Sequence, residues 1–508
     1  MSHTFDAYVL PRGIEPPPRP GLSFEAGALE VRFGDWDPAW VAGLAVALAA
    51  RSMELAARGA ASVLESLAHA GERFGDPRDP MRQQALELLP PTSGLSPAMA
   101  MAVLDGMAVG WREEELRGLV EAELGCVNRL DGFGAPVGVQ HGQASPPPLC
   151  LPVGPRLCVQ IVSGSVPGVG VSALVRSLLV KGPTLLKTGR GDVVLPVLFA
   201  RALREVDPEL ADALAVIYWP GGSARLEEAA IGPADVVVAY GSDETVRAVR
   251  DRTPVTARFV AYHHRLSVGV VGREALAEHR LDRTASEVAR AVALFDQRGC
   301  VSPQVVWVEE GGGAVEGALG AAGGAEGPAG AGEAWGSAGR AQVPAAPSAR
   351  VFARRLAGAL QELEGRLPGG ALEVEEGSAV QQLRGTAELM AASGSAVEVI
   401  HGGGSSWTVV YEAETGPPQA CVGRVVRVRP LASLDELPQV LEPVRHHLQT
   451  VGTAGLGARA DALAAELGRL GASRVVPFAS VAFPPARWHH DGGRPLGDLV
   501  RWVDLERE

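Results

Sequence analysis

The sequence Leu157-Cys-Val-Gln-Ile-Val-Ser163 is a short apolar run, rich in β-branched residues, that predicts a buried parallel strand. The glycine-rich stretch Gly164-Ser-Val-Pro-Gly-Val-Gly170 follows as a turn, and Val171 to Lys181 has the pattern of a helix. A second buried strand, Pro183-Thr-Leu-Leu-Lys187, comes next. These residues predict a β-α-β unit, in which two parallel strands are joined by a crossover helix.

The same alternation continues toward the C-terminus. A helix is predicted over Val193 to Glu205, and strands over Ala213 to Trp219 and over Ala234 to Tyr240. Gly241-Ser242 then opens a helix that runs through Arg250. Strand and helix therefore alternate four times with short connections, which is the pattern of a doubly wound α/β domain. Such a domain binds nucleotides outside the carboxyl ends of its strands.

Changes in composition along the chain divide it into four regions. Residues 1–150 are predicted to form an N-terminal arm and helical region, and residues 151–265 the nucleotide-binding domain. Residues 266–440 are predicted to form a second α/β domain, and residues 441–508 a C-terminal segment that packs back on the first. Within the second domain, residues 311–349 are almost entirely Gly, Ala, Pro, Ser and Glu, so we expect a disordered insertion there.

The bulk composition excludes several classes of protein. The formal net charge of −13 argues against a nucleic-acid partner, because phosphate binding needs a basic surface. The five cysteines are odd in number, widely spaced and without a CxxC pair, so neither a disulfide framework nor a metal site is expected. The apolar run from Trp40 to Ala50 is about half the ~20 residues of a membrane span. We therefore expect a cytoplasmic protein without a membrane span.

One cysteine stands in a context that suits chemistry. Cys300 lies in Phe295-Asp-Gln-Arg-Gly-Cys-Val-Ser-Pro-Gln304, after a predicted helix and in a polar turn closed by Pro303. Gly299 allows close approach of a substrate, and the N–H of Cys300 is then free to face an oxyanion. A free cysteine is more commonly an apolar filler, which is the interpretation we give to the other four. For Cys300 the turn alone leaves nucleophile and filler evenly balanced.

The segment around Cys300 is similar to the cysteine signature of the bioluminescence-type acyl-CoA reductases. These are the reductase subunits of fatty-acid reductase, a branch of the aldehyde dehydrogenase superfamily. The matching residues are Asp296, Gln297, Cys300, Ser302, Pro303 and Gln304. Further resemblances in the right order are Lys181 to Lys187, Tyr240-Gly-Ser242, His264-Arg-Leu-Ser267, Leu448-Gln-Thr-Val-Gly452, Trp488-His-His-Asp-Gly492 and Leu499-Val-Arg-Trp502.

The resemblance covers about residues 80–508 and implies a fold. That fold is α/β and aldehyde-dehydrogenase-like, with a doubly wound cofactor domain, an α/β catalytic domain and an N-terminal helical region. It also implies a homo-oligomer. The absence of a G-x-G-x-x-G fingerprint agrees with the resemblance, since the superfamily binds its dinucleotide without one.

The resemblance also points to cofactor residues. Lys187, at a strand end, resembles the lysine that contacts the adenosine ribose, and Arg190 stands where NAD-preferring relatives carry a glutamate. An arginine pairs with a 2′-phosphate, so NADPH is predicted, unless Arg190 is only a solvated surface charge. Gly241 and Ser242 open a helix where backbone N–H groups meet a pyrophosphate, and Gly164 belongs to the turn beside the cofactor.

The predicted chemistry follows from one residue that is replaced and one that is missing. Ser165 stands where the superfamily has an asparagine that binds the oxyanion, and we expect its hydroxyl to serve instead. Aldehyde-oxidising relatives use a glutamate base to activate water, but the corresponding stretch, Phe259 to Ser267, has no carboxylate. A thioester on Cys300 would therefore wait for hydride, which predicts NADPH-dependent reduction of a fatty acyl-CoA or acyl-protein thioester to the aldehyde.

The sequence also contains candidate histidines and leaves two alternative functions open. His264 is a candidate proton carrier or thiolate partner, or else a strand-end histidine with local hydrogen bonds. His489, His490 and Asp491 are interpreted as a structural contact of the C-terminus. An acyl-transferring or synthetase partner would supply the substrate. The alternatives are a catalytically decayed binding or scaffold protein on the same fold and a hydrolytic aldehyde dehydrogenase.

Overall fold

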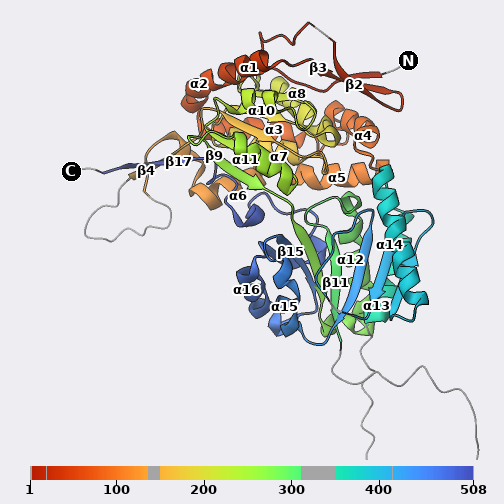
Figure 1. The fold of residues 1–508 in the computed structure, drawn as a ribbon. Helices are drawn as coiled ribbons and strands as arrows, with labels where there is room; N and C mark the ends of the chain where they lie inside the picture. The colour runs from red at the N-terminus through yellow and green to blue at the C-terminus, as the bar shows by residue number, and fades with distance from the viewer. Residues whose placement is uncertain (1–2, 19, 136–148, 311–348, 415, 507–508) are drawn as a thin grey trace, which may run out of the picture.

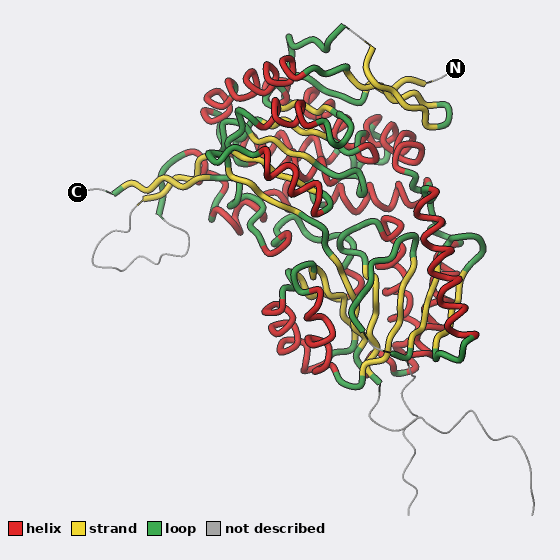
Figure 2. Tube along the Cα trace, viewed as in Figure 1, coloured by secondary structure: helices red, strands yellow, loops and turns green. Residues whose placement is uncertain are grey.

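The computed structural model describes residues 3–18, 20–135, 149–310, 349–414 and 416–506. Most of the predicted disordered insertion, residues 311–349, lies outside these ranges. Figure 1 shows two tiers, with one sheet and its helices above and a second, larger sheet below, and helix α5 at the junction. A short β-ribbon projects to one side of the upper tier (Figures 1 and 2).

The upper tier is built on the predicted doubly wound sheet, which the structure confirms. Its five strands are all parallel, in the order β7-β6-β5-β8-β9. They are β5 (Cys158–Ile161), β6 (Thr184–Lys187), β7 (Leu214–Ile217), β8 (Val236–Tyr240) and β9 (Arg258–Tyr262). The strand order reverses between β5 and β8, so the turns that follow these two strands open onto one crevice. Gly164 and Gly241 lie in those two turns.

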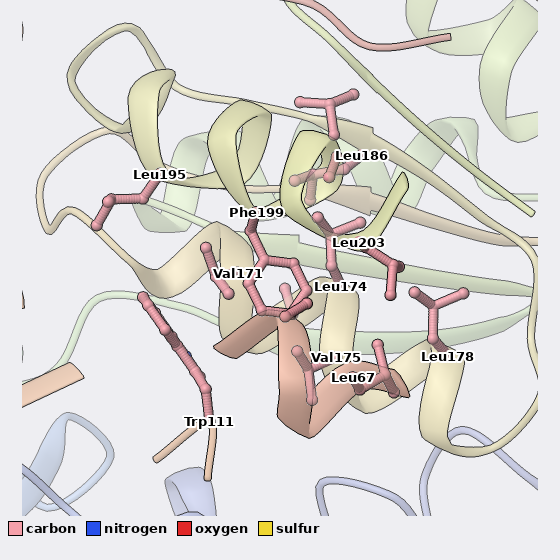
Figure 3. Close-up of a cluster of buried hydrophobic side chains, with 14 of the residues drawn as sticks. Leu67, Trp111, Val171, Leu174, Val175, Leu178, Leu186, Leu195, Phe199 and Leu203 are labelled. Atoms are coloured by element: carbon pink, nitrogen blue, oxygen red, sulfur yellow. The ribbon is translucent and has the colours of Figure 1, made fainter. Parts of the chain in front are cut away.

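Helices cover both faces of this sheet, so its central strands are buried at every position. The crossover helices are α7 (Val169–Leu179), α8 (Val194–Val206), α9 (Pro208–Ala211), α10 (Ala224–Ile231) and α11 (Asp243–Arg252). On one face, Phe199 of α8 packs between Trp111 and Phe74, with ring centroids 5.9 and 6.2 Å away, among aliphatic residues of α7 (Figure 3). This aromatic cluster joins the N-terminal helices to the sheet.

The N-terminal region contributes a small sheet and six helices. The sheet has the order β1-β3-β2, from β1 (His3–Asp6), β2 (Pro20–Ala26) and β3 (Leu29–Gly34). The helices are α1 (Pro38–Ala50), α2 (Ser52–Ala57), α3 (Ala60–Glu72), α4 (Pro80–Ser93), α5 (Pro97–Val109) and α6 (Glu113–Leu124). The sequence predicted helical runs here but not α4. The reason is that Pro90 and Pro91, which are typical of a helix end, lie inside α4.

Helices α1 and α2 together, Pro38–Ala57, are long and apolar enough by length and composition to cross a membrane. In the folded chain α1 buries Val41, Leu44 and Leu48 against strands of the five-stranded sheet. This contact accounts for the apolar run from Trp40 to Ala50. The absence of a membrane span stays a prediction.

The lower tier holds the predicted second α/β domain, built on a seven-stranded sheet in the order β12-β13-β14-β11-β10-β15-β16. All neighbours are parallel except β12 and β13. The strands are β10 (Leu266–Val271), β11 (Pro303–Glu309), β12 (Val397–His401), β13 (Thr408–Glu412), β14 (Val425–Leu431), β15 (Leu448–Ala454) and β16 (Arg474–Pro477). The helices are α12 (Glu278–Ala293), α13 (Ala349–Glu364), α14 (Val374–Ala392), α15 (Leu437–Leu441) and α16 (Ala460–Leu470). The sequence did not predict α14.

The C-terminal segment contacts both tiers. Strands β15 and β16 belong to the seven-stranded sheet, whereas β17 (Arg501–Leu505) pairs with β4 (Leu149–Val153) to form the projecting ribbon. Arg258 of β9 donates to the carbonyl oxygens of Asp498 and Val500, which fixes the chain end against the upper tier. The four boundaries drawn from the sequence stay a proposal.

The aromatic cluster predicts a stability change. Phe199 is fully buried, so Phe199→Ala leaves a cavity and is expected to lower the free energy of unfolding by about 3–5 kcal/mol. Urea denaturation followed by tryptophan fluorescence measures it. Met53→Ala is the control, since Met53 is 79% exposed and its loss is expected to change stability by no more than about 0.5 kcal/mol. A loss below about 1 kcal/mol for Phe199→Ala would contradict the packing described.

Candidate active site

Cys300 is held at the junction of the two tiers by an unusual turn. Between α12 and β11, the backbone of Phe295, Asp296 and Gln297 is left-handed, with φ of 59°, 50° and 63°. This region is unfavourable for residues with a side chain and costs of order 1–3 kcal/mol each. The turn therefore persists only because other contacts hold it.

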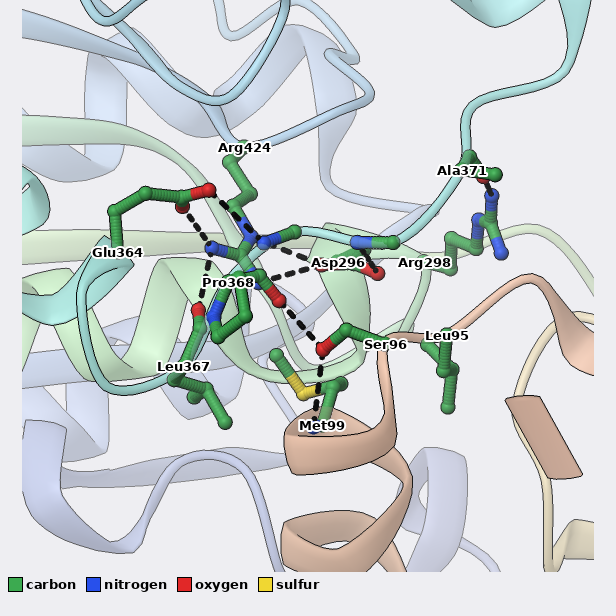
Figure 4. A network of polar contacts seen from close by, with 12 residues as sticks. Leu95, Ser96, Met99, Asp296, Arg298, Glu364, Leu367, Pro368, Ala371 and Arg424 are labelled. Atoms are coloured by element: carbon green, nitrogen blue, oxygen red, sulfur yellow. Dashed lines mark hydrogen bonds and ion pairs between the residues drawn. The ribbon is translucent and has the colours of Figure 1, made fainter. Parts of the chain in front are cut away.

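The first contact is a buried ion pair. The carboxylate of Asp296 lies 2.7 Å from Nη2 of Arg424 and accepts from its Nε at 2.9 Å, and both side chains are 3% exposed (Figure 4). Asp296 also accepts the N–H of Gly370 at 3.1 Å. Arg424 pairs with Glu364 as well, at 2.7 Å. These contacts hold the turn against Arg424, which directly precedes β14, and against Gly370, in the segment that follows α13.

The second contact comes from the amide of Gln297. Its Nε2 donates to the carbonyl oxygens of Pro303 and Val425 at 2.9 and 2.6 Å, and its Oε1 accepts the N–H of Val425 at 2.8 Å. This side chain joins β11 to β14 ahead of their regular ladder. Ser267 of β10 donates to the carbonyl oxygen of Cys300 at 2.6 Å. Asp296 and Gln297, both in the cysteine signature, therefore set the position of Cys300.

Cys300 opens onto a cavity of about 960 Å³, part of it open to solvent. Its lining is largely apolar and comes from α5, α6, α7 and the segment before β17, with Met107, Leu119, Val169, Phe295, Phe483 and Trp488 among the side chains. One cation, Arg176, reaches the lining and hydrogen-bonds Tyr240. An apolar substituent on the Cys300 sulfur would contact apolar side chains here.

The thiol of Cys300 is protonated at neutral pH in the resting protein. Surrounding protein atoms, and next the negative charge of Asp491, raise its pKa to about 11. A hydrogen bond from the side chain of Gln449 and the charge of Arg265 act in the opposite direction. The nucleophile is therefore generated during the reaction and is not stored as a thiolate.

A polar cluster adjoins the sulfur, and the sequence did not predict it. Gln449, on β15, donates from Nε2 to Oδ1 of Asp491 at 2.6 Å, and Nε of Arg265 lies 3.0 Å from Oδ2. His490 lines the cavity and stacks on Tyr262 at 4.2 Å and on Trp488 at 4.6 Å. Burial keeps the pKa of His490 well below its usual range, so the imidazole is neutral. The interpretation of His490 and Asp491 as a structural contact stays a prediction; the structure adds that His490 lines the cavity and that Asp491 holds Gln449 and Arg265.

His264 lies elsewhere. It is exposed, is not among the residues that line the Cys300 cavity, and has its N–H bonded to Asp243 at 3.2 Å. Its carbonyl oxygen accepts from Nδ1 of His263 and Nδ1 of His447, at 3.0 and 3.1 Å. Asp243, His263 and His447 bring potential metal-ligating atoms within 4.8 Å of one another. The two histidines contact the carbonyl oxygen of His264 and Asp243 accepts its N–H, so the backbone of His264 brings the three side chains together.

The cofactor residues predicted from the sequence lie along the crevice of the five-stranded sheet. Lys187, at the end of β6, has its Nζ 5.6 Å from the centre of the Tyr218 ring, and burial lowers its pKa to about 8 against the charge of Glu227. The guanidinium of Arg190 lies 4.4 Å from the centre of the Phe24 ring and is exposed. No ion pair of either cation occurs within the described residues. Both remain available to an anionic ligand.

The turns at the switch point are closely packed. A Cβ on Gly164 would lie 2.6 Å from the backbone N of Gly191, so only glycine lets the loops after β5 and β6 touch. Ser242 caps α11 by accepting the N–H of Thr245 at 3.3 Å. Ser165 is exposed, makes no hydrogen bond within the described ranges, and is not among the residues that line the cavity, although its neighbour Val166 is.

Buried Asp192 holds the same turn and was not predicted. Its carboxylate accepts the N–H groups of Gly168 and Gly170, both at 2.8 Å, at the start of α7. Burial raises the pKa of Asp192 to about 7, although these two bonds oppose the shift. No pattern in the sequence identifies this residue, since its partner is backbone.

The fold and site define a class: an aldehyde dehydrogenase-like protein with a cysteine on an apolar cavity at the junction of its two tiers. A family model described as acyl-CoA reductase (LuxC) matches residues 55–318 and 345–502. The chain therefore belongs to the acyl-CoA reductase (LuxC) family, as the cysteine signature indicated.

Curated relatives are named long-chain acyl-protein thioester reductase. One from Photobacterium phosphoreum is 26% identical over 42% of this chain and 42% of its own length, so the match spans about two-fifths of that relative. One from Vibrio harveyi is 22% identical over 88% of this chain and 82% of its own.

Solved structures of low sequence identity share the fold. A salicylaldehyde dehydrogenase from Pseudomonas putida G7 is 13% identical, with a TM-score of 0.68 over 99% of this chain and 98% of its own. An NADP-dependent glyceraldehyde-3-phosphate dehydrogenase from Bacillus halodurans C-125, solved with NADP, is 12% identical, with a TM-score of 0.67 over 99% and 100%. The aldehyde dehydrogenase-like fold is thus confirmed.

The raised pKa of Cys300 predicts how the thiol reacts with iodoacetamide. Because only the thiolate reacts, alkylation of Cys300 without ligands should keep rising with pH beyond about 9.5, where an ordinary thiol levels off. Peptide mass spectrometry separates Cys300 from exposed Cys126, which serves as the internal control. A plateau for Cys300 below about pH 8 would show a stored thiolate and contradict the electrostatics described.

Proposed function

We propose that this protein reduces a fatty acyl thioester to the aldehyde with NADPH, through a covalent thioester on Cys300. The observation that carries the proposal is the position of Cys300, whose apolar cavity also reaches the switch point of the five-stranded sheet through Val166 and Tyr240. Membership of the acyl-CoA reductase family supports it. The acyl donor is coenzyme A or a protein thiol, and an acyl-transferring or synthetase partner would deliver it.

In the first step the sulfur of Cys300 attacks the thioester carbonyl. A new bond forms between that sulfur and the acyl carbon, the bond to the donor sulfur breaks, and the cysteine proton ends on the departing thiol. His490 is better placed than His264 to relay this proton, because its neutral imidazole lines the same cavity. The acyl chain then extends along the apolar lining.

The second step needs a hydride at the acyl carbon, which a bound dihydronicotinamide would supply. The carbon–sulfur bond would break, the aldehyde would leave, and the Cys300 thiolate so released would take up one proton. The dinucleotide supplies two electrons and one hydrogen; the protein binds it, orients it and keeps water from the thioester. Lys187 and Arg190 would hold the ribose and its 2′-phosphate, and Ser242 and the N-terminus of α11 the pyrophosphate.

Reduction is favoured over hydrolysis because no carboxylate is among the described residues that line the Cys300 cavity. The end of β9 and the residues after it, Ala261, Tyr262 and His263, carry none. The carboxylate whose charge acts on Cys300, Asp491, has one oxygen on Gln449 and the other beside Arg265. A hydrolytic aldehyde dehydrogenase needs such a base free. The full set of contacts around Cys300 likewise favours an enzyme over a decayed scaffold.

Replacing the nucleophile tests the proposal. With dodecanoyl-coenzyme A as the probe, the wild type should oxidise NADPH and release coenzyme A in equal amounts. Cys300→Ala should lose both to below about 1% of the wild-type rate, since no other group can take the acyl chain. Cys126→Ala, an exposed cysteine outside the cavity, is the control and should keep full activity. Coenzyme A release with free fatty acid and no NADPH oxidation would support hydrolysis instead.

The exposed guanidinium of Arg190 predicts cofactor preference. NADPH should be favoured over NADH, and Arg190→Ala should lower kcat/KM for NADPH by roughly 10–100-fold while leaving that for NADH within about twofold. Steady-state kinetics with both cofactors measures this. Arg283→Ala removes an exposed arginine of α12, outside the crevice, and should change neither value. A wild-type preference for NADH would end the assignment.

A further inference from the structure

The acyl oxygen becomes an oxyanion when Cys300 attacks the substrate and again when the thioester on Cys300 is reduced. This oxyanion needs hydrogen-bond donors, and Ser165, the donor predicted from the sequence, is poorly placed. Ser165 is exposed and makes no hydrogen bond within the described ranges, to Cys300 or to any other residue. The backbone N–H of Cys300 is directed toward its own sulfur, so it is one donor. Removing one of two such donors typically costs about 10²–10³ in rate, so a second donor is expected.

The side chain of Gln449 meets the requirement. It is fully buried at the start of β15 and hydrogen-bonds both the Cys300 thiol and Asp491. Its orientation is fixed because the carboxylate of Asp491 only accepts, so Nε2, which carries both hydrogens, must face it. One hydrogen serves Asp491 at 2.6 Å, and the other is left for the sulfur of Cys300.

Acylation changes what this second hydrogen meets. In the resting protein the side chain of Gln449 hydrogen-bonds the sulfur of Cys300. In a thioester on Cys300, the carbonyl oxygen lies only two bonds from that sulfur. A thioester sulfur is a weak acceptor, whereas the adjacent oxygen, which gains negative charge during attack, is a strong one. We propose that the side-chain amide of Gln449 is the second oxyanion donor of this enzyme, and that Asp491 is the positioning residue that holds it.

The contacts of Asp491 are consistent with that role. Its backbone is left-handed, with φ of 53°, and its side chain is 6% exposed, anchored by Arg265 at 3.0 Å. The side chain of Asp491 is therefore held by its contacts with Gln449 and Arg265 as well as by the conformation of its own loop. It also joins two segments far apart in the chain, Leu448 to Gly452 and Trp488 to Gly492.

The proposal rests on the proposed function and is tested by comparing two reactions of the same sulfur. Transfer of the acyl group from dodecanoyl-coenzyme A builds an oxyanion, whereas alkylation by iodoacetamide does not. Rapid-quench release of coenzyme A gives the first rate, and peptide mass spectrometry gives the second. Both reactions use the Cys300 thiolate. The acyl-transfer rate divided by the alkylation rate, measured at one pH, is therefore independent of the fraction of thiolate.

Gln449→Met keeps the size of the side chain and removes both donors. The acyl-transfer rate divided by the alkylation rate should fall by about 10²–10³. Ser165→Ala should change the ratio by less than about twofold. A ratio unchanged in Gln449→Met, or a hundredfold loss in Ser165→Ala, would overturn the proposal. If Cys300→Ala still transferred the acyl group, the proposed function itself would fail instead.

Asp491→Asn separates a positioning role from a structural one. Asparagine tolerates the left-handed backbone, but it removes the charge that opposes the Cys300 thiolate and weakens the bond to Gln449. The alkylation rate should therefore rise, while the acyl-transfer rate divided by the alkylation rate falls by about fivefold. Loss of structure would slow both reactions together. Equal changes in the two rates, in either direction, would count against the role of Asp491.

Discussion

The ion pair between Asp296 and Arg424 is the constraint on which the site depends. It holds a turn of three left-handed residues that is unfavourable by itself, and so fixes where Cys300 stands relative to both tiers. Both groups are buried, so loss of one partner would leave an uncompensated charge, at a cost of about 3–5 kcal/mol. Gln297 completes the arrangement by bonding the backbone on both sides of the turn. The residues before the cysteine thus hold its loop in place, and the sulfur is left to react.

The electrostatics of the sulfur follow from this placement. A cysteine surrounded by protein and facing Asp491 is a protonated thiol at rest, which protects it from adventitious alkylation and oxidation. The same carboxylate orients Gln449, so one group lowers the reactivity of the free thiol and supports the acyl-enzyme. The apolar cavity on Cys300 also reaches the turn after β5 and the end of β8, so the proposed acyl and dinucleotide sites would meet at the sulfur.

Much of the fold was predictable because it rests on local patterns. Buried parallel strands are continuous apolar runs, and β5, β6, β7 and β8 were predicted nearly to the residue. Helix α4 was missed because Pro90 and Pro91 lie inside it. Of the site, Cys300 was identified from its signature, but Gln449, His490 and Asp491 were not given roles there. Their meeting at the sulfur is a long-range contact, and no local periodicity encodes it; only their place in segments that resemble the family offered a signal.

The central claim is that Cys300 carries the acyl group between the two half-reactions. Peptide-level mass spectrometry tests it most directly, after the protein is mixed with dodecanoyl-coenzyme A without NADPH and quenched in acid. The account predicts a dodecanoyl adduct on the peptide that contains Cys300, which disappears when NADPH is added and is replaced by an equal amount of dodecanal. An adduct on another residue, or one that decays to fatty acid at the same rate with and without NADPH, would contradict it.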